Sequence, residues 1–329
     1  MKKCCFIILY FGKLPNYFSL FLKSCKWNPD FNWLVITDDN QKYEYPENVF
    51  VENISFYDMQ KLINSKFDFQ ISLSSPYKLC DYKPAYGYIF EDYLLDYKFW
   101  GHCDIDTLMG NLSNFISEDI LEFNDKVFCL GHMTLYKNTW SNNRLFMSDY
   151  KGQSLYKDVF SNDAICWFDE EWKDDYNVNQ IFLTQGKRVY KKDFSLNFEM
   201  LPSQFIRTKY VGIHTQDCPH GYQVEKYKDA LYLWEKGNLY RLFILNNQLC
   251  REDFSYMHLQ QRKMKYTTSI ADNDTIKIMP NIFCSLEVNS VTINNFNTIK
   301  RHPNSLQSLS IQLNSKWKKL KNKVSKILD

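Results

Sequence analysis

Two aspartates, Asp104 and Asp106, stand two positions apart directly after the apolar pair Phe99-Trp100. In an extended segment, side chains at positions i and i+2 point to the same side, with Cα atoms roughly 6.5–7 Å apart. Two carboxylates at the end of a buried strand are costly to bury unless a positive charge lies between or beyond them. A hard divalent cation such as Mg²⁺ or Mn²⁺ takes oxygen ligands and shares them with phosphate. The spacing therefore predicts a cation site, with Ile105 pointing into the protein.

An acidic triplet alone is a weak signal, because such triplets occur by chance and most lie on solvated loops. Here the triplet follows an aromatic apolar run, and a helical pattern over residues 77–97 precedes it. That is the strand-end position at which open α/β sheets bind ligands. Gly101, inside the run, is expected to let the backbone pass close to a neighbouring segment.

Three further stretches carry side chains of chemical interest. The segment from Trp167 to Trp172 brackets three acids with aromatic rings, a composition common in sugar sites and equally consistent with a solvated, anchored loop. His258 stands among apolar residues, where a core histidine is more frequent than a ligand. The segment 77–87 mixes lysines, an aspartate and tyrosines, which suits either a ligand-holding surface or an ordinary amphipathic helix.

The elements that position these residues begin with a strand, a helix and a strand. An apolar strand is expected from Lys3 to Tyr10, an amphipathic helix over Phe18–Cys25, and a second strand over Phe31–Thr37. Polar residues follow the second strand. This order is half of a doubly wound nucleotide-binding sheet, a Rossmann-like α/β fold. The chain has no glycine-rich phosphate loop, which disfavours dinucleotide and P-loop sites.

Later elements follow from the same patterns. Ser55 and Asp58 resemble a capping box that opens a helix. Lys236-Gly237-Asn238 is expected to join two strands of a hairpin. The remaining expectations are a strand at Val49–Val51, strands at Lys126–His132 and Met133–Lys137, and helices at Thr139–Tyr150 and Tyr176–Gln185.

Composition limits the class of protein. The chain has 329 residues, of which 45% are hydrophobic, and a net charge of +2, so no strong field points to nucleic acid as a partner. The ten cysteines include no C-x-x-C pair, which favours reduced core thiols and a cytoplasmic location. The apolar N-terminus is interrupted by Gly12 and Pro15 and suits a buried strand better than a signal peptide. No apolar run is long enough to span a membrane.

The C-terminal segment 316–329 differs from the rest of the chain. It carries six lysines, and Trp317, Leu320, Val324 and Ile327 recur at helical spacing. A basic amphipathic helix of this kind either adsorbs to an anionic membrane surface or packs on the protein with its lysines in water. We therefore expect one domain over residues 1–265 and an extension over 266–329 that ends in this helix.

Four separate motifs resemble the D-x-D-containing GT-A glycosyltransferases encoded in bacterial surface-polysaccharide clusters, which make capsule or lipopolysaccharide. The resemblance spans about residues 1–265 and does not name the sugar. It implies a GT-A-like, mostly parallel central sheet flanked by helices, to which the C-terminal helix is added. The motifs are Lys78–Gly87, Phe99–Asp106, Gly131–Tyr136 and Tyr256–Met264.

The resemblance also implies a metal site. In such enzymes the first aspartate of D-x-D lies near the ribose or the metal and the second binds the metal, which would be the roles of Asp104 and Asp106. A late histidine often completes the metal shell, and His258 fits that position. The implied ion is Mn²⁺ or Mg²⁺, and by family habit the donor is a UDP-sugar.

Other residues are carried over in the same way. Residues after the first two strands commonly hold the base, which implicates Tyr10, Thr37 and Asp38. Lys83, and with it Lys78, would bring positive charge to the ribose or diphosphate.

The implied reaction is transfer of a hexose to a glycan or lipid-linked oligosaccharide on the inner face of the bacterial inner membrane. Asp169 or Glu170 would accept the acceptor proton if the reaction inverts the anomeric centre. If it retains, these acids would orient the sugars. A non-catalytic nucleotide- or sugar-binding homologue and a nucleotide-sugar hydrolase are the alternatives.

Overall fold

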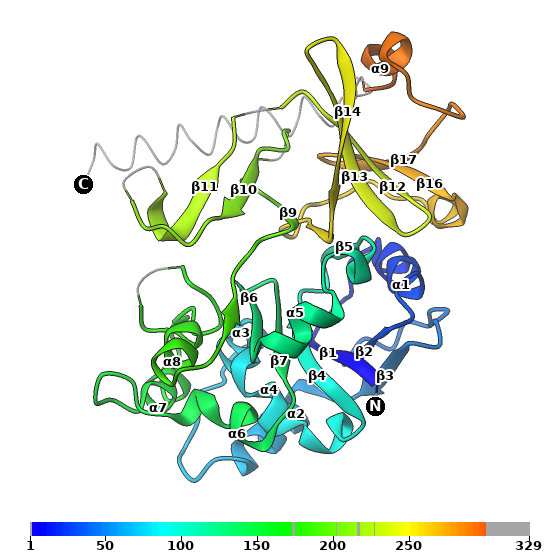
Figure 1. Cartoon of the computed structure of the whole chain (residues 1–329). Coiled ribbons are helices and arrows are strands. Elements are labelled where there is room, and N and C mark those ends of the chain that lie inside the picture. The colour runs from blue at the N-terminus through cyan, green and yellow to red at the C-terminus, as the bar shows by residue number, and fades with distance from the viewer. Residues whose placement is uncertain (1, 173–174, 202, 216–217, 227, 301–329) are drawn as a thin grey trace, which may run out of the picture.

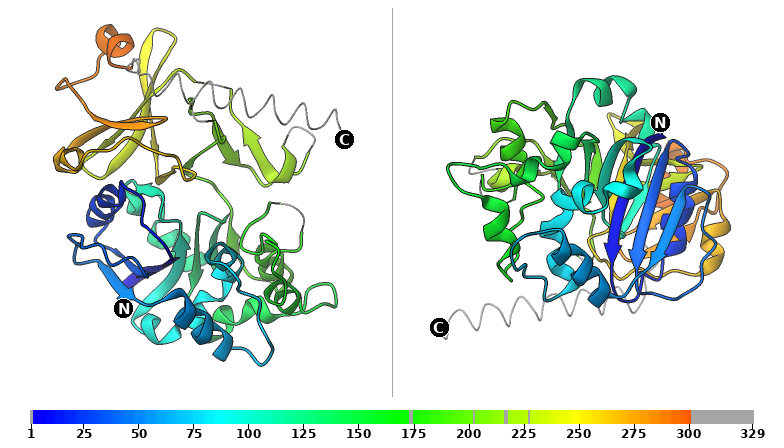
Figure 2. Two further views of the ribbon diagram at one scale, coloured as in Figure 1. Left: turned by 180° about the vertical axis from the view of Figure 1, so that it is seen from behind. Right: turned by 90° about the horizontal axis from the view of Figure 1, so that it is seen from below.

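The structure is a computed structural model, and it describes residues 2–300 except 173–174, 202, 216–217 and 227. The predicted basic helix at 316–329 lies outside these residues. The described chain has two halves (Figure 1). The central sheet and its helices form one half, and two further sheets form the other. The same division is visible from behind (Figure 2, left).

A seven-stranded sheet with the order β3-β2-β1-β4-β7-β6-β8 organises the first half. Neighbouring strands are parallel except at β7, which is antiparallel to both β4 and β6. The predicted α/β fold with a mostly parallel central sheet is therefore confirmed. Its strands are β1 (Lys2–Tyr10), β2 (Phe31–Thr37), β3 (Val49–Asn53), β4 (Tyr97–Cys103), β6 (Lys126–Leu130), β7 (Met133–Lys137) and β8 (Val189–Tyr190).

The central strands carry apolar side chains on both faces of this sheet, and both faces are therefore covered by other elements. On β1, Cys5 and Ile7 join one hydrophobic cluster, while Phe6 and Ile8 join another. The first face packs against α2 (Phe56–Ser65), α3 (Leu79–Tyr82), α4 (Tyr86–Ile89), α7 (Leu155–Phe160) and α8 (Val178–Thr184). The second packs against α1 (Phe18–Lys26) and α5 (Glu118–Phe123).

Local sequence signals explain where several helices begin and end. The side chain of Ser55 accepts a hydrogen bond from the Asp58 N–H at 3.1 Å, so the predicted cap of α2 is confirmed. The predicted continuous helical pattern over 77–97 is wrong. The chain instead alternates α3 and α4 with the 3₁₀ turns η1 (Pro76–Lys78), η2 (Lys83–Ala85) and η3 (Glu91–Leu94). Pro84 has no N–H to donate, so the helix cannot continue through it.

The helix predicted over Thr139–Tyr150 is likewise wrong in its extent. Only α6 (Trp140–Asn143) and the 3₁₀ turn η5 (Leu145–Met147) form there. The side-chain amide of Asn142 donates to the Lys137 carbonyl, and that of Asn143 donates to the Asn138 side chain. Such local side-chain bonds compete with the helical backbone.

Two five-stranded sheets make up the second half. The order of one is β11-β10-β9-β15-β5, and the order of the other, which is fully antiparallel, is β14-β13-β12-β16-β17. The first contains β5 (Thr107–Met109), β9 (Ser195–Phe198), β10 (Arg207–Tyr210), β11 (Tyr222–Val224) and β15 (Tyr256–His258). The second contains β12 (Leu231–Glu235), β13 (Asn238–Leu245), β14 (Gln248–Phe254), β16 (Thr275–Met279) and β17 (Ile282–Ser285).

The hairpin predicted around Gly237 is confirmed as β12 and β13. Its two loop residues, Lys236 and Gly237, both have positive φ, at 46° and 83°, as a tight hairpin turn requires. The strands β16 and β17 follow the proposed boundary at residue 265, yet β16 pairs with β12 on the other side of it. The helix α9 (Ile293–Ile299) contributes Phe296 to the cluster on that sheet. The boundary at residue 265 stays a proposal.

Two further expectations concern cysteines and membrane spans. Cys4, Cys5, Cys25, Cys103 and Cys129 are buried as free thiols in the hydrophobic interior. Within the residues that the structure describes, every helix is too short or too polar to cross a membrane. The remaining short helices are η4 (Leu112–Asn114), η6 (Pro219–Gly221) and η7 (Thr268–Asp272).

Candidate active site

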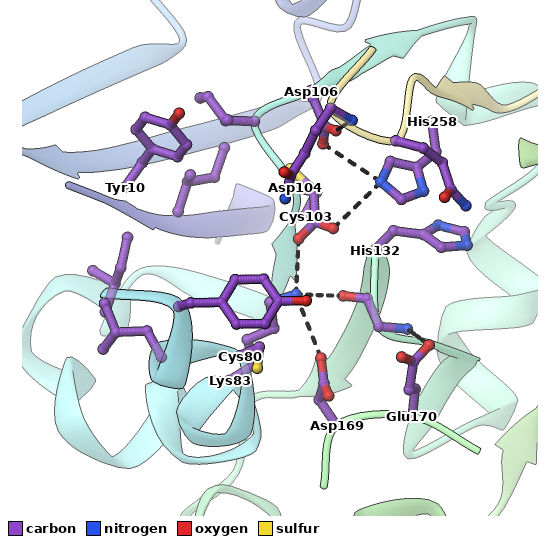
Figure 3. Close-up of a pocket in the computed structure, with 18 of the residues that line it drawn as sticks. Tyr10, Cys80, Lys83, Cys103, Asp104, Asp106, His132, Asp169, Glu170 and His258 are labelled. Carbon is purple, nitrogen blue, oxygen red and sulfur yellow. Dashed lines mark hydrogen bonds and ion pairs between the residues drawn. The ribbon is translucent and has the colours of Figure 1, made fainter. Parts of the chain in front are cut away.

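A cavity of about 930 Å³ opens at the carboxyl ends of β1 and β4 (Figure 3). These two strands are adjacent in the sheet, although β2 and β3 lie between them in the chain. The strand order therefore reverses here, and open α/β sheets bind ligands at such a reversal. Tyr10 ends β1, and Asp104 follows β4 directly. Both line the cavity.

Asp104, Asp106 and His258 converge inside this cavity. β5 and β15 pair so that Thr107 lies opposite His258, which carries the histidine to the acidic turn. The Nε2 atom of His258 lies 3.6 Å from Asp104 Oδ2 and 3.5 Å from Asp106 Oδ1. One ligand atom from each of the three residues lies within 4.8 Å of the others. Ile105 packs in the hydrophobic interior, as predicted.

Hydrogen bonds fix this group in one arrangement. The Asp106 carboxylate accepts the Gln261 N–H at 2.5 Å, and the Asp106 carbonyl accepts the Leu259 N–H at 2.9 Å. The Thr107 hydroxyl donates to the Asp104 carbonyl at 2.7 Å. The acidic turn is therefore tied both to itself and to the segment after β15.

The donor set fits a divalent cation. His258 Nδ1 lies 3.0 Å from the side-chain oxygen of Asn197, an acceptor that favours a proton on this nitrogen and leaves Nε2, the atom nearer to the carboxylates, as the one that would bind a cation. Two ligands at right angles on an ion with bonds of about 2.1 Å lie about 3 Å apart, close to the observed spacing. Burial alone would lower the pKa of His258, but Asp106 and Asp104 outweigh it and raise that pKa.

Lys83 links the acidic turn to a second acidic group. Its ammonium lies 2.7 Å from Asp104 Oδ1, 2.7 Å from the Gly131 carbonyl and 3.4 Å from Asp169 Oδ2 (Figure 3). Burial alone would lower the pKa of Lys83, but the two carboxylates raise it well above its usual value. Lys83 therefore carries a full positive charge between the two acidic groups.

Asp169 and Glu170 form the second acidic group. Burial raises the pKa of Asp169 to about 7, against the effect of Lys83, and burial also raises the pKa of Glu170. The Gly131 N–H donates to Glu170 at 3.3 Å. A Cβ at position 131 would lie 2.8 Å from the Glu170 carboxyl carbon, so a larger residue there would displace this carboxylate. Glu171 turns away and binds the hydroxyl of Tyr210.

The structure separates three of the predicted residues from the cavity. Thr37 accepts the Asp39 N–H within the loop after β2, whereas Asp38 accepts the Gly12 N–H at 2.7 Å and holds the loop after β1. Neither residue lines the cavity. Their predicted contact with a base stays a prediction. Lys78 is buried against Asp81 at 2.8 Å, which leaves Lys83 as the lysine of this segment in the cavity.

Sequence reasoning missed three residues that shape the site. Asn197 orients His258, Gln261 holds Asp106, and Lys263 lines the cavity as an exposed lysine. Gln261 and Lys263 lie within the motif Tyr256–Met264, and this motif was the sequence feature that could have indicated them. Asn197 lies on β9, and no local pattern distinguishes it.

Comparisons with known proteins give a family. The model of a family of unknown function, DUF6625, matches residues 6–287, and the chain belongs to that family. A comparison with curated proteins gave no match.

Three solved structures with some likeness to this chain are glycosyltransferases. The galactosyltransferase LgtC in complex with donor and acceptor sugar analogues has 12% identity and a TM-score of 0.32 over 58% of this chain and 75% of that chain. An active-site variant of LgtC has 12% identity and a TM-score of 0.33, and the match covers 58% of this chain and 74% of the variant. The apo form of GlyE from Streptococcus pneumoniae TIGR4 has 9% identity and a TM-score of 0.35, and the match covers 59% of this chain and 46% of GlyE. Likeness at this level carries no inference about activity.

Proposed function

We propose that this protein is a metal-dependent glycosyltransferase that moves a sugar from a nucleotide diphosphate sugar to a hydroxyl of a glycan. The observation that carries the proposal is the convergence of Asp104, Asp106 and His258 in a cavity at the strand-order reversal. The sequence resemblance adds UDP as the nucleotide. Lys83 and two further buried acids stand beside the three candidate ligands.

The donor would occupy the cavity from Tyr10 to the candidate metal ligands. Asp104, Asp106 and His258 would hold Mn²⁺ or Mg²⁺, and the bound ion supplies Lewis-acid stabilisation of charge on the leaving diphosphate. Lys83 is in reach of the same region, and Lys263 lies at the cavity wall. Both ammonium groups favour a diphosphate by charge-assisted hydrogen bonds.

The acceptor would meet Asp169 and Glu170. A pKa of about 7 leaves a substantial fraction of Asp169 ionised at neutral pH and able to take a proton from a sugar hydroxyl. In an inverting reaction one of these acids is the general base, and in a retaining reaction they orient the sugars. NMR of the product's anomeric configuration tests the base role, which a retained configuration would remove.

The test of the proposed function is calorimetry with UDP, GDP, CDP and dTDP, each with and without Mn²⁺. We expect one nucleotide to bind only with Mn²⁺, and Asp106→Asn to weaken that binding at least tenfold. The amide keeps the shape of the side chain and its bond from Gln261 but loses the charge. Asp92→Asn, on an exposed turn, is the matched control. Binding of no nucleotide would favour a non-catalytic protein instead.

A lipid-linked acceptor is the part of this proposal that rests on residues 316–329. The lysine-rich segment would hold the protein at an anionic leaflet. Deleting it should reduce sedimentation with phosphatidylglycerol vesicles and leave UDP binding intact. Equal sedimentation of both forms would remove the membrane component.

A further inference from the structure

Three aromatic rings gather at the edge of the cavity, and we call Trp172, His220 and Tyr222 the aromatic platform. The indole of Trp172 stacks on the imidazole of His220, with ring centroids 5.2 Å apart and an interplanar angle of 21°. The Tyr222 ring meets the same indole edge-on at 5.6 Å. Segments far apart in the chain thus build one surface.

The platform is continuous with the cavity, and its Trp172 and His220 side chains are exposed to solvent, while Tyr222 is buried beneath them. Trp172 and Tyr222 line the cavity, and Trp172 is 41% exposed. Tyr77 and Met200 line it too and are 65% and 78% exposed. Exposed large apolar side chains that gather at one opening are characteristic of a binding surface.

The position of the platform relative to the charged groups limits its ligand. Trp172 follows Glu170 by two residues, and Glu170 faces the cavity beside Gly131. Tyr10 and the candidate metal ligands lie on one side of the Lys83 ammonium, and Asp169 and Glu170 lie on the other (Figure 3). A ligand on the platform is therefore beside the carboxylates of the second acidic group.

We infer that the aromatic platform binds the acceptor sugar of the proposed reaction, as a β-D-pyranoside whose ring stacks on Trp172. This inference rests on the proposed function. The hydrogens on C1, C3 and C5 of β-glucosides and β-galactosides share one face, which gives an aromatic ring an apolar surface. An α-mannoside places its axial C1 substituent on that face and is expected to fit poorly. The ring hydroxyls would then lie within reach of Glu170 and Asp169.

The test combines two measurements on the full chain in Mg²⁺ and UDP. Saturation-transfer NMR gives the Kd of methyl β-D-glucopyranoside, methyl β-D-galactopyranoside and methyl α-D-mannopyranoside. Calorimetry gives the Kd of UDP. The variants are Trp172→Ala and Trp172→Phe, and the matched control is Trp140→Ala, which removes a 74% exposed tryptophan outside the cavity.

We expect at least one β-glycoside to bind, and to bind at least fivefold more tightly than the α-mannoside. Trp172→Ala should weaken that binding at least fivefold, while Trp172→Phe and Trp140→Ala retain most of it. UDP affinity should be equal in all four proteins, which also shows that the variants fold.

Three results would overturn the inference. The first is that no glycoside binds, and the second is that Trp172→Ala binds the glycoside as tightly as the unmodified protein. The third is that Trp172→Ala loses affinity for UDP, which would assign the platform to the nucleotide. Failure of the proposed function is a separate result, because the unmodified protein would then bind none of UDP, GDP, CDP and dTDP.

Discussion

Among the acids that face the cavity, Asp169 has a pKa near neutrality, so its ionisation can be followed between pH 5 and 8. Its carboxylate is buried 3.4 Å from Lys83, and burial raises its pKa to about 7. Lys83 also contacts Asp104, so one ammonium serves both acidic groups. Single-residue changes at these positions separate the two groups experimentally.

The titration of Asp169 predicts a pH-dependent stability difference. Its folded-state pKa of about 7 exceeds the unfolded value near 3.9, so this group stabilises the fold fully below about pH 4 and the stabilisation is lost as pH rises through 7. Asp169→Asn lacks that titration. Between pH 5 and 8, the free energy of unfolding of Asp169→Asn should rise by about 2 kcal/mol relative to the unmodified protein.

Urea unfolding in EDTA at several pH values measures this difference. Asp92→Asn, which is exposed, should follow the unmodified protein at every pH. A difference that stays constant with pH would show that the Asp169 pKa is close to its ordinary value in the folded chain.

Lys83→Met should weaken UDP binding in Mn²⁺ by about 10–100-fold, because one charge-assisted hydrogen bond contributes about 1.5–3 kcal/mol. The methionine retains most of the side-chain volume. Lys98→Met, an exposed lysine on β4, is the control and should bind UDP normally. Calorimetry measures both, and an unchanged Kd for Lys83→Met would place the diphosphate elsewhere.

At the scale of elements, the site depends on how closely β4 approaches its neighbours. Gly101 lies opposite Leu135 on β7 and beside Phe6 on β1. A Cβ there would lie 2.5 Å from the Thr134 carbonyl oxygen and 3.0 Å from the Phe6 ring. The predicted close backbone approach at Gly101 is thereby confirmed.

Gly101→Ala should therefore lower the free energy of unfolding by about 2 kcal/mol, since the added methyl forces β4 and β7 apart. The same shift would displace the acidic turn at the end of β4 and weaken Mn²⁺-dependent UDP binding. Urea unfolding and calorimetry measure the two effects. A stability change below about 0.5 kcal/mol would show that the strands separate without cost.

At the scale of the whole molecule, a buried ionic cluster joins the second and third sheets. Arg241 on β13 pairs with Glu225 at 2.9 Å and with Glu252 at 2.6 Å, and Arg207 on β10 pairs with Glu225 at 3.1 Å. Arg241 is 1% exposed. Removal of Arg241 leaves two partly buried carboxylates, Glu225 and Glu252, with less positive charge to compensate them.

Arg241→Met should lower the free energy of unfolding by about 3 kcal/mol. Arg251→Met breaks the pair with Asp253 at the solvent-exposed side of β14 and should cost less than about 1 kcal/mol. Thermal or urea unfolding compares the two. Equal effects would mean that the buried cluster contributes no more than a surface ion pair.

Features that depend on residues close together in the chain could be predicted from the sequence. Apolar runs predicted β1 and β2, a capping pair predicted the start of α2, and a glycine turn predicted one hairpin. The i, i+2 spacing predicted that Asp104 and Asp106 act together, but the two residues lie in the turn after β4 and not in the extended segment assumed for that spacing. Helices interrupted by Pro84 or by asparagines were predicted too long, since local side-chain bonds override periodicity.

Tertiary structure alone decided which distant residues join the acidic turn. His258 reaches it only because β15 pairs with β5, and Asn197 fixes the histidine only because β9 pairs with β15. Thr37 lies opposite Tyr10 in the sheet, yet it binds Asp39, Asp38 binds Gly12, and neither residue lines the cavity. Strand pairing between segments far apart in the chain depends on the packing of whole layers, and no local pattern encodes it.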